Sequence, residues 1–426
     1  MSSVKNSNGE NAKRMERTER KFLGISPTQW IFIGMAIGIA LGHFWPEIGV
    51  HAKVFSNIFI RLIKSIIAPI LLATLIVGIA STGNIKTMGR IGGKALLYFE
   101  IVTTLALIVG LVAANWIRPG DGAPQVTSSK EKPDAAKAKT ATEIIEHAFP
   151  TSIIDSMAKG EVLQIVVFAM IFGAACTVLG AKAAPMIEWF DTLAHVMFKY
   201  TAYVMKMTPL GVGAAIAFTV STQGIGILVQ LGKLVLTIYG SLIVFVIFVL
   251  GSVILVCRIP LLRFFQAVKD PCLIAFSTAS SEAALPRALE NMEKFGVPKH
   301  IVSFVLPTGY SFNLDGTTLY LAGASLFCAQ LAQIELTWTQ QVLMMFTLML
   351  TSKGVAGVPR ASLVILSGTI LSFGIPEAGI MTILAIDEIL DMARTSVNVL
   401  GNCLATAVIA RWEGFDLSKE PEPVEL

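Results

Sequence analysis

Long apolar runs, separated by short polar segments, fill the first 256 residues of the chain. They cover about 27–44, 54–80, 95–117, 152–181, 184–222 and 225–256. Several of them reach the roughly 20 residues that an α-helix needs to cross a bilayer. Because a membrane offers no water to satisfy the backbone, each run is expected to be helical. The pattern therefore predicts an all-α membrane protein.

Beyond residue 258 the pattern changes, and the first run that follows, 261–276, is too short to span a membrane on its own. Residues 261–276 lead into the serine-rich stretch 277–282, and a second short limb follows at 283–292. The same plan recurs around the glycine-rich stretch 352–362, which lies between two further short limbs. Non-helical backbone at membrane depth is tolerated only where protein or a water-filled cavity surrounds it. We therefore expect two re-entrant helical hairpins.

The run at 301–332 is interrupted at 309–317 by Gly, Asn and Asp, which favour turns over helix interiors. The halves are too short to cross separately, which favours one broken helix over two spans joined by a loop. A broken helix offers carbonyls and N–H groups together, and so can bind a cation and an anion. A hairpin followed by a broken or polar helix occurs twice, at 260–333 and at 338–412. This indicates a weak internal repeat, as expected for transporters built from inverted repeats.

Polar side chains gather on one face of an otherwise apolar helix near the end of the chain. At 100° per residue they fall within about 80° of arc. They are Asp387, Asp391, Arg394, Asn398 and Asn402. A charged side chain at bilayer depth costs roughly 2.5–3.5 kcal/mol, so this stripe indicates a binding site for a zwitterionic or anionic solute. A purely structural ion pair between Asp391 and Arg394 is the alternative.

The composition supports the membrane assignment. Of 426 residues, 54% are hydrophobic and only 15% charged, with a mean hydropathy of +0.70. Soluble globular proteins carry about 25% charged residues, so that class is excluded. The five cysteines lie in apolar runs without paired spacing, which predicts neither a disulfide framework nor a metal site.

Charged segments between the runs predict the orientation. Residues 1–22 are basic and lack the cleavage site of a secretory leader, and 83–94 form a basic loop without an acid. By the positive-inside rule both lie in the cytoplasm. The stretch 119–150 is rich in Pro, Gly, Ala and Lys and is expected to form an outside loop.

Four short motifs follow one another in the second half of the chain. They are Ser280-Ser281-Glu282, Asn313-Leu314-Asp315-Gly316-Thr317, the stretch 354–359 and the stretch 391–398. In this order and spacing they resemble the glutamate/dicarboxylate–cation symporter family, over about 27–412. Within it, the chain is most similar to bacterial glutamate/aspartate symporters coupled to protons, or to protons and sodium.

The resemblance implies eight transmembrane helices, two re-entrant hairpins, a homotrimer and an elevator-type mechanism. The scaffold would comprise 27–94 (helices 1 and 2) and 151–223 (helices 4 and 5). The moving transport domain would comprise 95–118 (helix 3) and 224–412 (helices 6, 7 and 8 with both hairpins). The remaining segments would be a cytoplasmic tail at 1–26, an extracellular loop at 119–150 and a cytoplasmic tail at 413–426. The expected location is the bacterial inner (plasma) membrane, multi-pass, with both termini cytoplasmic.

The resemblance also implies a substrate site. Arg394 would pair with the side-chain carboxylate, since a guanidinium offers a two-point fork. Asp391 would hold the α-ammonium, and Asn398 and Ser281 the α-carboxylate. Thr317 and Thr395 would line the side-chain end. The second hairpin would act as the extracellular gate. The implied substrate-binding residues are Ser280, Ser281, Thr317, Gly357, Val358, Asp391, Arg394, Thr395 and Asn398.

Asp391 separates two classes of substrate. A dicarboxylate such as succinate or malate has no ammonium group to satisfy it, and an unpaired buried aspartate is costly. Family members that carry dicarboxylates tend to have a non-acidic residue at this position. Asp391 beside Arg394 therefore favours an acidic amino acid. Glutamate and aspartate cannot be ranked, because one methylene is worth only about 1–3 kcal/mol in a pocket.

Two departures from the sodium-coupled pattern favour protons as the coupling ion. Asn402 replaces an aspartate, and hard cations prefer charged oxygen ligands. Glu100 stands where sodium-coupled relatives tend to have tyrosine, and a low-dielectric surrounding favours the protonated form of a carboxyl. A structural or interfacial role for Glu100 is the alternative. The implied coupling residues are Glu100, Thr103, Thr104, Gly309, Asn313, Asp315 and Asn402.

Three further positions bear on coupling and gating. Asp315 is an aspartate, as in the sodium-coupled pattern, so one of the sodium sites could be retained. Mammalian members have a proton-carrying glutamate at the position of Leu321. A leucine cannot carry a proton, so that way of coupling is excluded here. Arg360 stands where bacterial relatives often have glycine, either as a solvated charge or as a residue that alters gating or selectivity.

The sequence therefore predicts a secondary active symporter that takes up glutamate or aspartate with protons and needs no cofactor. Sodium-coupled or C4-dicarboxylate symport is the alternative. An anion channel should have a continuous polar lining, whereas the polarity here is clustered at one depth. An enzyme needs a nucleophile–base or metal constellation, and the five histidines are scattered. No nucleic-acid partner is expected.

Overall fold

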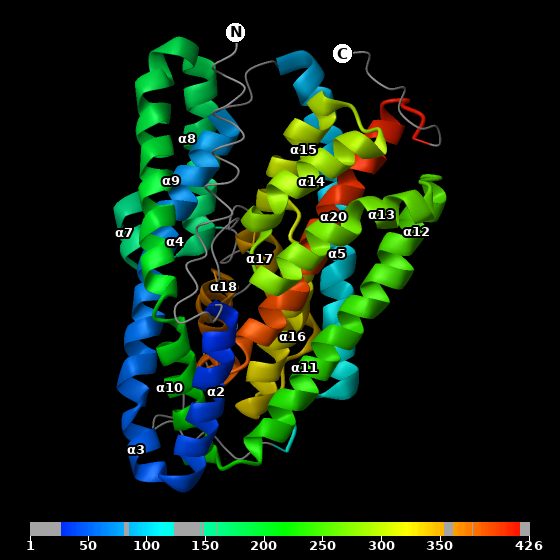
Figure 1. Ribbon diagram of the computed structural model, residues 1–426. Coiled ribbons are helices and arrows are strands. Elements are labelled where there is room, and N and C mark those ends of the chain that lie inside the picture. Colours follow the sequence, from blue (N-terminus) through cyan, green and yellow to red (C-terminus); the bar gives the residue numbers. More distant parts are fainter. Residues whose placement is uncertain are drawn as a thin grey trace, which may run out of the picture.

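The part of the chain that the structure describes folds into two side-by-side groups of helices (Figure 1). The computed structural model describes residues 27–80, 85–122, 146, 149–159, 161–352, 361–376 and 378–417. In Figure 1 the first group, coloured blue to green, lies on the left, and the second group, which includes the yellow to red C-terminal helices, lies on the right.

The first group is built on one packed pair of helices and one packed set of three. Its members are α2 (Pro27–Phe44), α3 (Pro46–His51), α4 (Lys53–Ala80), α7 (Ile153–Lys159), α8 (Val162–Leu179), the 3₁₀ turn η1 (Gly180–Ala183), α9 (Ala184–Met205) and α10 (Thr208–Gln223). Helix α10 packs along α2, and α4 packs against both α8 and α9. Of the predicted scaffold segments 27–94 and 151–223, the described helices up to Ala80 and from Ile153 to Gln223 therefore lie in one group, whereas 85–94 belong to α5 of the second group.

Glycines let α2 and α10 approach until their backbones touch. A Cβ added to Gly34, Gly38 or Gly42 would lie 2.4, 2.2 or 2.6 Å from a carbonyl oxygen of α10. The three glycines recur every four residues and so share one face of α2. Small residues at such spacing are typical of close helix packing in membranes.

The variant Gly38→Ala is expected to destabilise the protein. Its methyl group would meet the Gly213 carbonyl at 2.2 Å, so the two helices must move apart. Overpacking of this kind costs about 1–3 kcal/mol. Thermal unfolding in detergent, followed by size-exclusion chromatography, should show an earlier transition. Gly232→Ala is the matched control because nothing lies within 4 Å of its added Cβ; equal stability of both variants would contradict the prediction.

The second group surrounds its last helix. Its members are α5 (Ile85–Ile117), α11 (Ile227–Val244), the π-helical segment η2 (Phe245–Leu250), α12 (Gly251–Val256), α13 (Leu261–Thr278), α14 (Ser281–Phe295), α15 (Lys299–Phe312), α16 (Asp315–Leu331), α17 (Trp338–Thr351), α18 (Ala361–Ser372), α19 (Ala378–Leu384) and α20 (Asp387–Trp412). Helices α5, α11 and α13 to α16 all pack against α20. The polar stripe of α20 is therefore enclosed by protein.

The first predicted hairpin and the broken helix are both present. Helices α13 and α14 pack against each other and are joined at Ala279, whose φ of 48° allows the sharp turn. Ser280 caps α14, because its Oγ accepts from the Ala283 N–H at 3.3 Å. The broken helix is interrupted between α15 and α16, at Asn313 and Leu314. The tip of the second hairpin, with Gly357, Val358 and Arg360, lies outside the described residues.

Helix α5 starts earlier than the sequence predicts. The basic loop expected at 83–94 is wrong from Ile85 onward, because α5 is continuous from there. Arg90 and Lys94 lie one turn apart and both pair with Glu413, just beyond the end of α20; the Lys94 Nζ–Glu413 Oε1 distance is 2.7 Å. The predicted boundary at residue 94 thus falls within one helix. These ion pairs give the basic residues a structural role at the end of α20.

The apolar run before the stripe is a separate helix. Helix α19 ends at Leu384, and α20 begins at Asp387 after a turn. Asp387 and Glu388 therefore occupy the first turn of α20, where the positive end of the helix dipole favours acids.

Five segments of the described chain are long and apolar enough to cross a membrane. They are Pro27–Phe44, Pro46–Val77, Arg90–Ile117, Val167–Met205 and Ile227–Val256. Helices α15 and α16 have 14 and 17 residues, so neither is such a segment by itself. These lengths indicate a multi-pass membrane protein, and the count of eight spans stays a prediction.

Candidate functional site

The stripe predicted on α20 is buried along its length. Each of its five polar side chains is at most 7% exposed. Charged side chains are almost never buried this deeply unless they are paired. The stripe separates into a charged cluster at the start of α20 and an amide cluster two turns further on.

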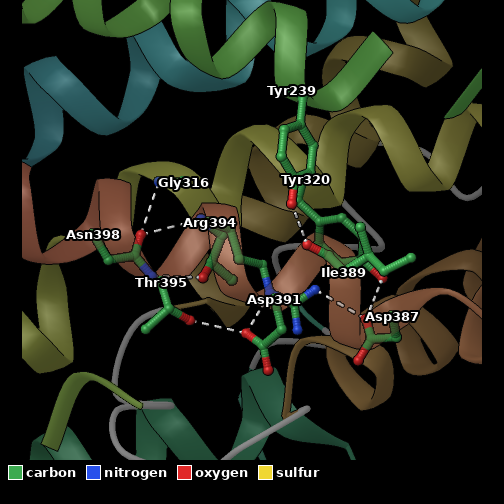
Figure 2. Close-up of polar contacts among 10 residues, drawn as sticks. Tyr239, Gly316, Tyr320, Asp387, Ile389, Asp391, Arg394, Thr395 and Asn398 are labelled. Atoms are coloured by element: carbon green, nitrogen blue, oxygen red, sulfur yellow. Dashed lines mark hydrogen bonds and ion pairs between the residues drawn. The ribbon is translucent and has the colours of Figure 1, made fainter. Parts of the chain in front are cut away.

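Arg394 is the centre of the charged cluster (Figure 2). Its Nη1 donates to Asp387 Oδ1 at 3.0 Å, and its Nε donates to Asp391 Oδ1 at 2.9 Å. The Tyr320 ring lies over the guanidinium, 4.3 Å from Cζ to the ring centroid, and its hydroxyl donates to Asp387 Oδ1 at 3.2 Å. Among the described residues, Nη2 has no hydrogen-bond acceptor. Two strong N–H donors therefore remain for an anionic group.

Asp391 uses one of its two carboxylate oxygens within the protein. Oδ1 accepts from Arg394 Nε and from Thr395 Oγ1, the latter at 3.0 Å (Figure 2). The described residues supply no donor to Oδ2. Asp391 is thus held in place by two neighbours and keeps an oxygen available for a cationic group.

Asn398 joins the stripe to the broken helix. Its Oδ1 accepts from the backbone N–H groups of Gly316 at 2.8 Å and Thr317 at 3.2 Å (Figure 2). Its Nδ2 donates to Thr317 Oγ1 at 2.9 Å. These N–H groups belong to the first turn of α16, which has no intrahelical acceptors for them. A Cβ on Gly316 would lie 2.3 Å from the Arg394 carbonyl, so only glycine allows this approach.

The first hairpin is bonded to α20 near the stripe. Ser396 Oγ donates to the Cys272 carbonyl of α13 at 3.0 Å. At the hairpin tip, Ser280 is committed to capping α14, while Ser281 is the first residue of that helix and half-buried. The contribution of Gly357 and Val358 lies outside the described residues.

The amide cluster centres on Asn402. Its Nδ2 donates to the Asn313 carbonyl at 3.2 Å and to the Asn398 carbonyl at 2.9 Å. A Cβ on Gly309 would lie 2.1 Å from Asn402 Oδ1, so the backbone of α15 touches this side chain. The Asn402 amide thus bonds to one carbonyl at the break between α15 and α16 and to one carbonyl of α20.

Asp315 lies in a second buried group of oxygens. Its Oδ2 accepts from Asn313 Nδ2 at 3.1 Å, and Thr103 Oγ1 approaches its Oδ1 at 3.5 Å. Asp315, Asn313 and Thr103 are all 0% exposed, and Asn313 Oδ1 has no hydrogen-bond partner among the described residues. Carboxylate, amide and hydroxyl oxygens are suitable ligands for a hard cation.

The remaining predicted coupling residues lie beside this group on α5. Thr103, one turn from Glu100, contacts Asp315, whereas Thr104 is exposed and donates to the Glu100 carbonyl at 2.6 Å and towards Met349. Glu100 itself is half-buried. The structure therefore brings Thr103 into the candidate cation site and directs the Thr104 hydroxyl elsewhere.

A comparison of the chain with models of protein families supports the family resemblance that the four motifs indicated. The model of the sodium:dicarboxylate symporter family matches residues 28–412. The chain belongs to this family. Both clusters of α20 and the whole broken helix lie inside the matched range, and the tails lie outside it.

Curated relatives from this symporter family match nearly the whole chain. One is the proton/sodium-glutamate symport protein of Geobacillus stearothermophilus, 44% identical over 90% of this chain and 94% of the relative. Another is the proton/glutamate-aspartate symporter of Escherichia coli, 43% identical over 91% and 93%. A third is the C4-dicarboxylate transport protein of Pseudomonas chlororaphis, 41% identical over 90% and 88%. The family and these relatives are transporters, which rules out the enzyme alternative.

Sequence reasoning gave no role to three residues of this symporter's charged cluster. Asp387 was included in the stripe without a function, and it turns out to share Arg394 with Asp391. Tyr320 lies between two leucines on α16, so no local signal reveals its position over Arg394. Glu388 is buried, at 6% exposed, although it lies outside the helical arc of the stripe.

Proposed function

We propose that this chain takes up glutamate or aspartate by symport with protons. The observation that carries the proposal is the pairing of Arg394 and Asp391, in which each keeps an unused hydrogen-bonding edge. A carboxylate fits the Nη2 edge of Arg394, and an ammonium fits Asp391 Oδ2. The relatives named for glutamate or aspartate agree with this substrate class.

The charged cluster favours an acidic amino acid over a simple dicarboxylate. A dicarboxylate would pair with Arg394 but would leave Asp391 facing another anion. Thr317 and Thr395, whose hydroxyls already bond to Asn398 and Asp391, lie on either side of this pair. Two further groups are proposed to complete the site, the hairpin tip at Ser281 and the second hairpin at Gly357 and Val358.

Protons are proposed as the coupling ion because of the contacts of Asn402. Its NH₂ group donates to two carbonyls, those of Asn313 and Asn398, which a cation at this place would need as ligands. Because the neutral Asn402 amide already donates to both carbonyl oxygens, they are not free to coordinate a cation. Glu100 is proposed as a proton carrier, since it lies on α5 one turn from the Asp315 group.

The variant Asn402→Asp is expected to make uptake depend on sodium. The carboxylate would remove the two competing N–H donors and supply an anionic ligand beside the Asn313 and Asn398 carbonyls. We expect at least about tenfold stimulation of uptake by sodium, equivalent to about 1.4 kcal/mol of binding. Asn291→Asp on α14 is the control. Sodium-independent uptake by Asn402→Asp would contradict the assignment.

A sodium-coupled or C4-dicarboxylate symporter is the second candidate. The Asp315 group favours sodium, because it offers a carboxylate, an amide oxygen and a hydroxyl within one buried space. The dicarboxylate relative is nearly as similar as the glutamate relatives. Asp391 is the residue whose charge argues against the dicarboxylate.

The proposed mechanism is elevator-type transport by a homotrimer in the inner membrane, with both termini cytoplasmic. The first helix group would be the scaffold, and the second group would move with the substrate. The enclosure of α20 by helices of its own group supports this division. The proposed organisation is eight membrane-spanning helices with hairpins α13–α14 and α17–α18.

The test is uptake by purified protein in liposomes. Radiolabelled glutamate, aspartate and succinate would be followed under an imposed inward proton gradient and, separately, under a sodium gradient at equal ionic strength. The proposal expects amino-acid uptake on the proton gradient alone and its loss in Glu100→Gln. Proton-driven uptake that survives in Glu100→Gln would place the proton elsewhere. Uptake only with sodium, or a preference for succinate, would contradict the proposal.

A further inference from the structure

Tyr239 of α11 is a polar residue to which the proposed function gives no role. Its hydroxyl donates to the backbone carbonyl of Ile389 at 2.7 Å (Figure 2). Its ring is partly buried and packs against the hydrophobic core. Because Ile389 lies between Asp387 and Asp391, this bond joins α11 to the part of α20 that holds the charged cluster.

Tyr239 bonds to α20 at a residue that points away from the polar stripe. At 100° per residue, Ile389 lies about 160° around the helix from Asp391 and about 140° from Arg394. The acceptor is a main-chain carbonyl, whose second lone pair can take this bond in addition to the bond within the helix. Tyr239 is therefore placed to act on the solute site through the backbone of α20.

The first turn of α20 begins at an isoleucine. Ile386 is the N-cap, and its side chain has no oxygen that could accept from the N–H groups of the first turn. The Ile389 N–H donates to the Ile386 carbonyl at 3.1 Å, and the Leu390 N–H reaches the same carbonyl at 3.3 Å. A bond to the third residue back has poorer geometry than the regular bond of an α-helix. A hydrogen bond from a neighbouring helix is therefore expected to matter more here than in the middle of α20.

Helix α11 contacts α16 at the residue next to Tyr239. A Cβ added to Gly323 of α16 would lie 2.5 Å from Cδ1 of Ile238, so the two helices are close at this point. Gly323 is three residues after Tyr320, and residues three apart are neighbours on a helix. Two consecutive residues of α11 thus contact the two helices that form the cluster, because Ile238 packs on α16 and Tyr239 bonds to α20.

The geometry of the charged cluster depends on how α16 and α20 lie relative to each other. Tyr320 of α16 stacks on the Arg394 guanidinium of α20, 4.3 Å from Cζ to the ring centroid, and donates to Asp387 at 3.2 Å. Hydrogen bonds weaken steeply when their angle departs from linearity. A shift of the first turns of α20 would therefore weaken these contacts and move the binding edges of Arg394 and Asp391.

We infer that Tyr239 is a positioning residue for the charged cluster. Its bond to the Ile389 carbonyl fixes the first turns of α20 against α16, and so sets where Arg394 and Asp391 hold the solute. The inference deepens the proposed function and rests on it for the identity of that solute. Tyr239→Phe removes the hydroxyl and keeps the ring. A neutral hydrogen bond contributes modestly, so we expect this variant to bind glutamate about three- to tenfold more weakly.

Equilibrium binding to the purified full-length protein tests the inference. Titration with radiolabelled glutamate, aspartate and succinate gives both the Kd and the number of sites per protein. Tyr239→Phe should raise the Kd of each solute that the wild type binds and leave the number of sites unchanged. A residue needed only for folding would lower the number of sites at an unchanged Kd. That result, or an unchanged Kd with all sites present, would overturn the inference.

Ser241→Ala is the matched control on the same helix. The Ser241 hydroxyl donates to the Thr237 carbonyl at 2.6 Å, so it bonds within α11 and not to α20. Its removal should leave the Kd at the wild-type value. A Kd raised equally by Ser241→Ala and Tyr239→Phe would show that any lost hydroxyl of α11 has this effect, and the role of Tyr239 would fail.

Hydrogen exchange followed by mass spectrometry tests the anchor itself without any solute. Backbone amides of a locally opening turn exchange faster than those of the surrounding helix. Tyr239→Phe should speed exchange in the peptide that covers residues 387–393, and Ser241→Ala should not. Exchange at the wild-type rate in Tyr239→Phe would show that the hydroxyl does not hold the turn, which overturns the inference.

Failure of this inference is distinguishable from failure of the proposed function. If the wild type binds succinate and neither amino acid, the proposed function fails, while the Kd for succinate still tests Tyr239. If the wild type binds glutamate or aspartate and Tyr239→Phe binds them equally well, only the role of Tyr239 fails.

Discussion

Arg394→Lys is expected to lower glutamate and aspartate uptake by roughly 100-fold, or about 3 kcal/mol. The guanidinium donates from separate nitrogens to Asp387 and Asp391 while it stacks on the Tyr320 ring. A lysine ammonium keeps the charge but has one nitrogen and no planar fork, so it cannot make these contacts and also hold a carboxylate at two points. Initial uptake rates and binding affinity in the same preparation measure the effect.

The matched control for Arg394→Lys is Arg287→Lys on α14. Arg287 pairs with Asp270 and Glu290 at the surface, where ion pairs contribute about 0–1 kcal/mol. It should leave uptake within about twofold of wild type. Near-normal affinity in Arg394→Lys would show that the substrate carboxylate binds elsewhere.

Asp391→Asn is expected to reverse the preference between amino acids and dicarboxylates. The amide oxygen can still accept from Arg394 Nε and Thr395 Oγ1, so the shape of the cluster is kept. The negative charge opposite the substrate ammonium is lost. Loss of a buried charge pair costs about 2–5 kcal/mol, so the glutamate-to-succinate ratio of affinities should fall by roughly 30-fold or more.

Competition between labelled glutamate and unlabelled succinate measures that ratio directly. Asp270→Asn serves as the control because Asp270 is an exposed acid on α13 whose pairing with Arg287 lies outside the site. If Asp391→Asn still preferred glutamate as strongly as the wild type, the ammonium would have to bind elsewhere.

Much of the fold is predictable from the sequence because membrane helices and helix breaks have strong local signals. Residues 27–44 appear as α2 with the predicted bounds, and the interruption at Asn313 and Leu314 falls inside the predicted stretch. Helix α5 was predicted to start too late. The basic residues Arg90 and Lys94 look like a loop in the sequence, but their partner Glu413 lies more than 300 positions further along the chain.

The site was predictable where its residues share one helix face. Arg394 and Asp391 lie on one stripe, so periodicity alone brings them together. The contact of Tyr320 with Arg394, and the capping of α16 by Asn398, depend on how α16 and α20 pack. No pattern within either segment encodes that packing. The sequence also suggested a weakened sodium site at Asn402, but only the structure shows its amide bonded to the two carbonyls.

The position of Asn398 has a consequence for energy conversion. Its side chain bonds to the first turn of α16 beside the charged cluster, and its carbonyl accepts from Asn402 in the amide cluster. A coupling free energy between two ligands is reciprocal, so whatever the ion does to solute affinity, the solute does to ion affinity by the same factor. Under the proposed function, Asn398 links the solute site to the contacts of Asn402 at the break between α15 and α16. A change at this break is therefore expected to reach the solute site through the contacts of one residue.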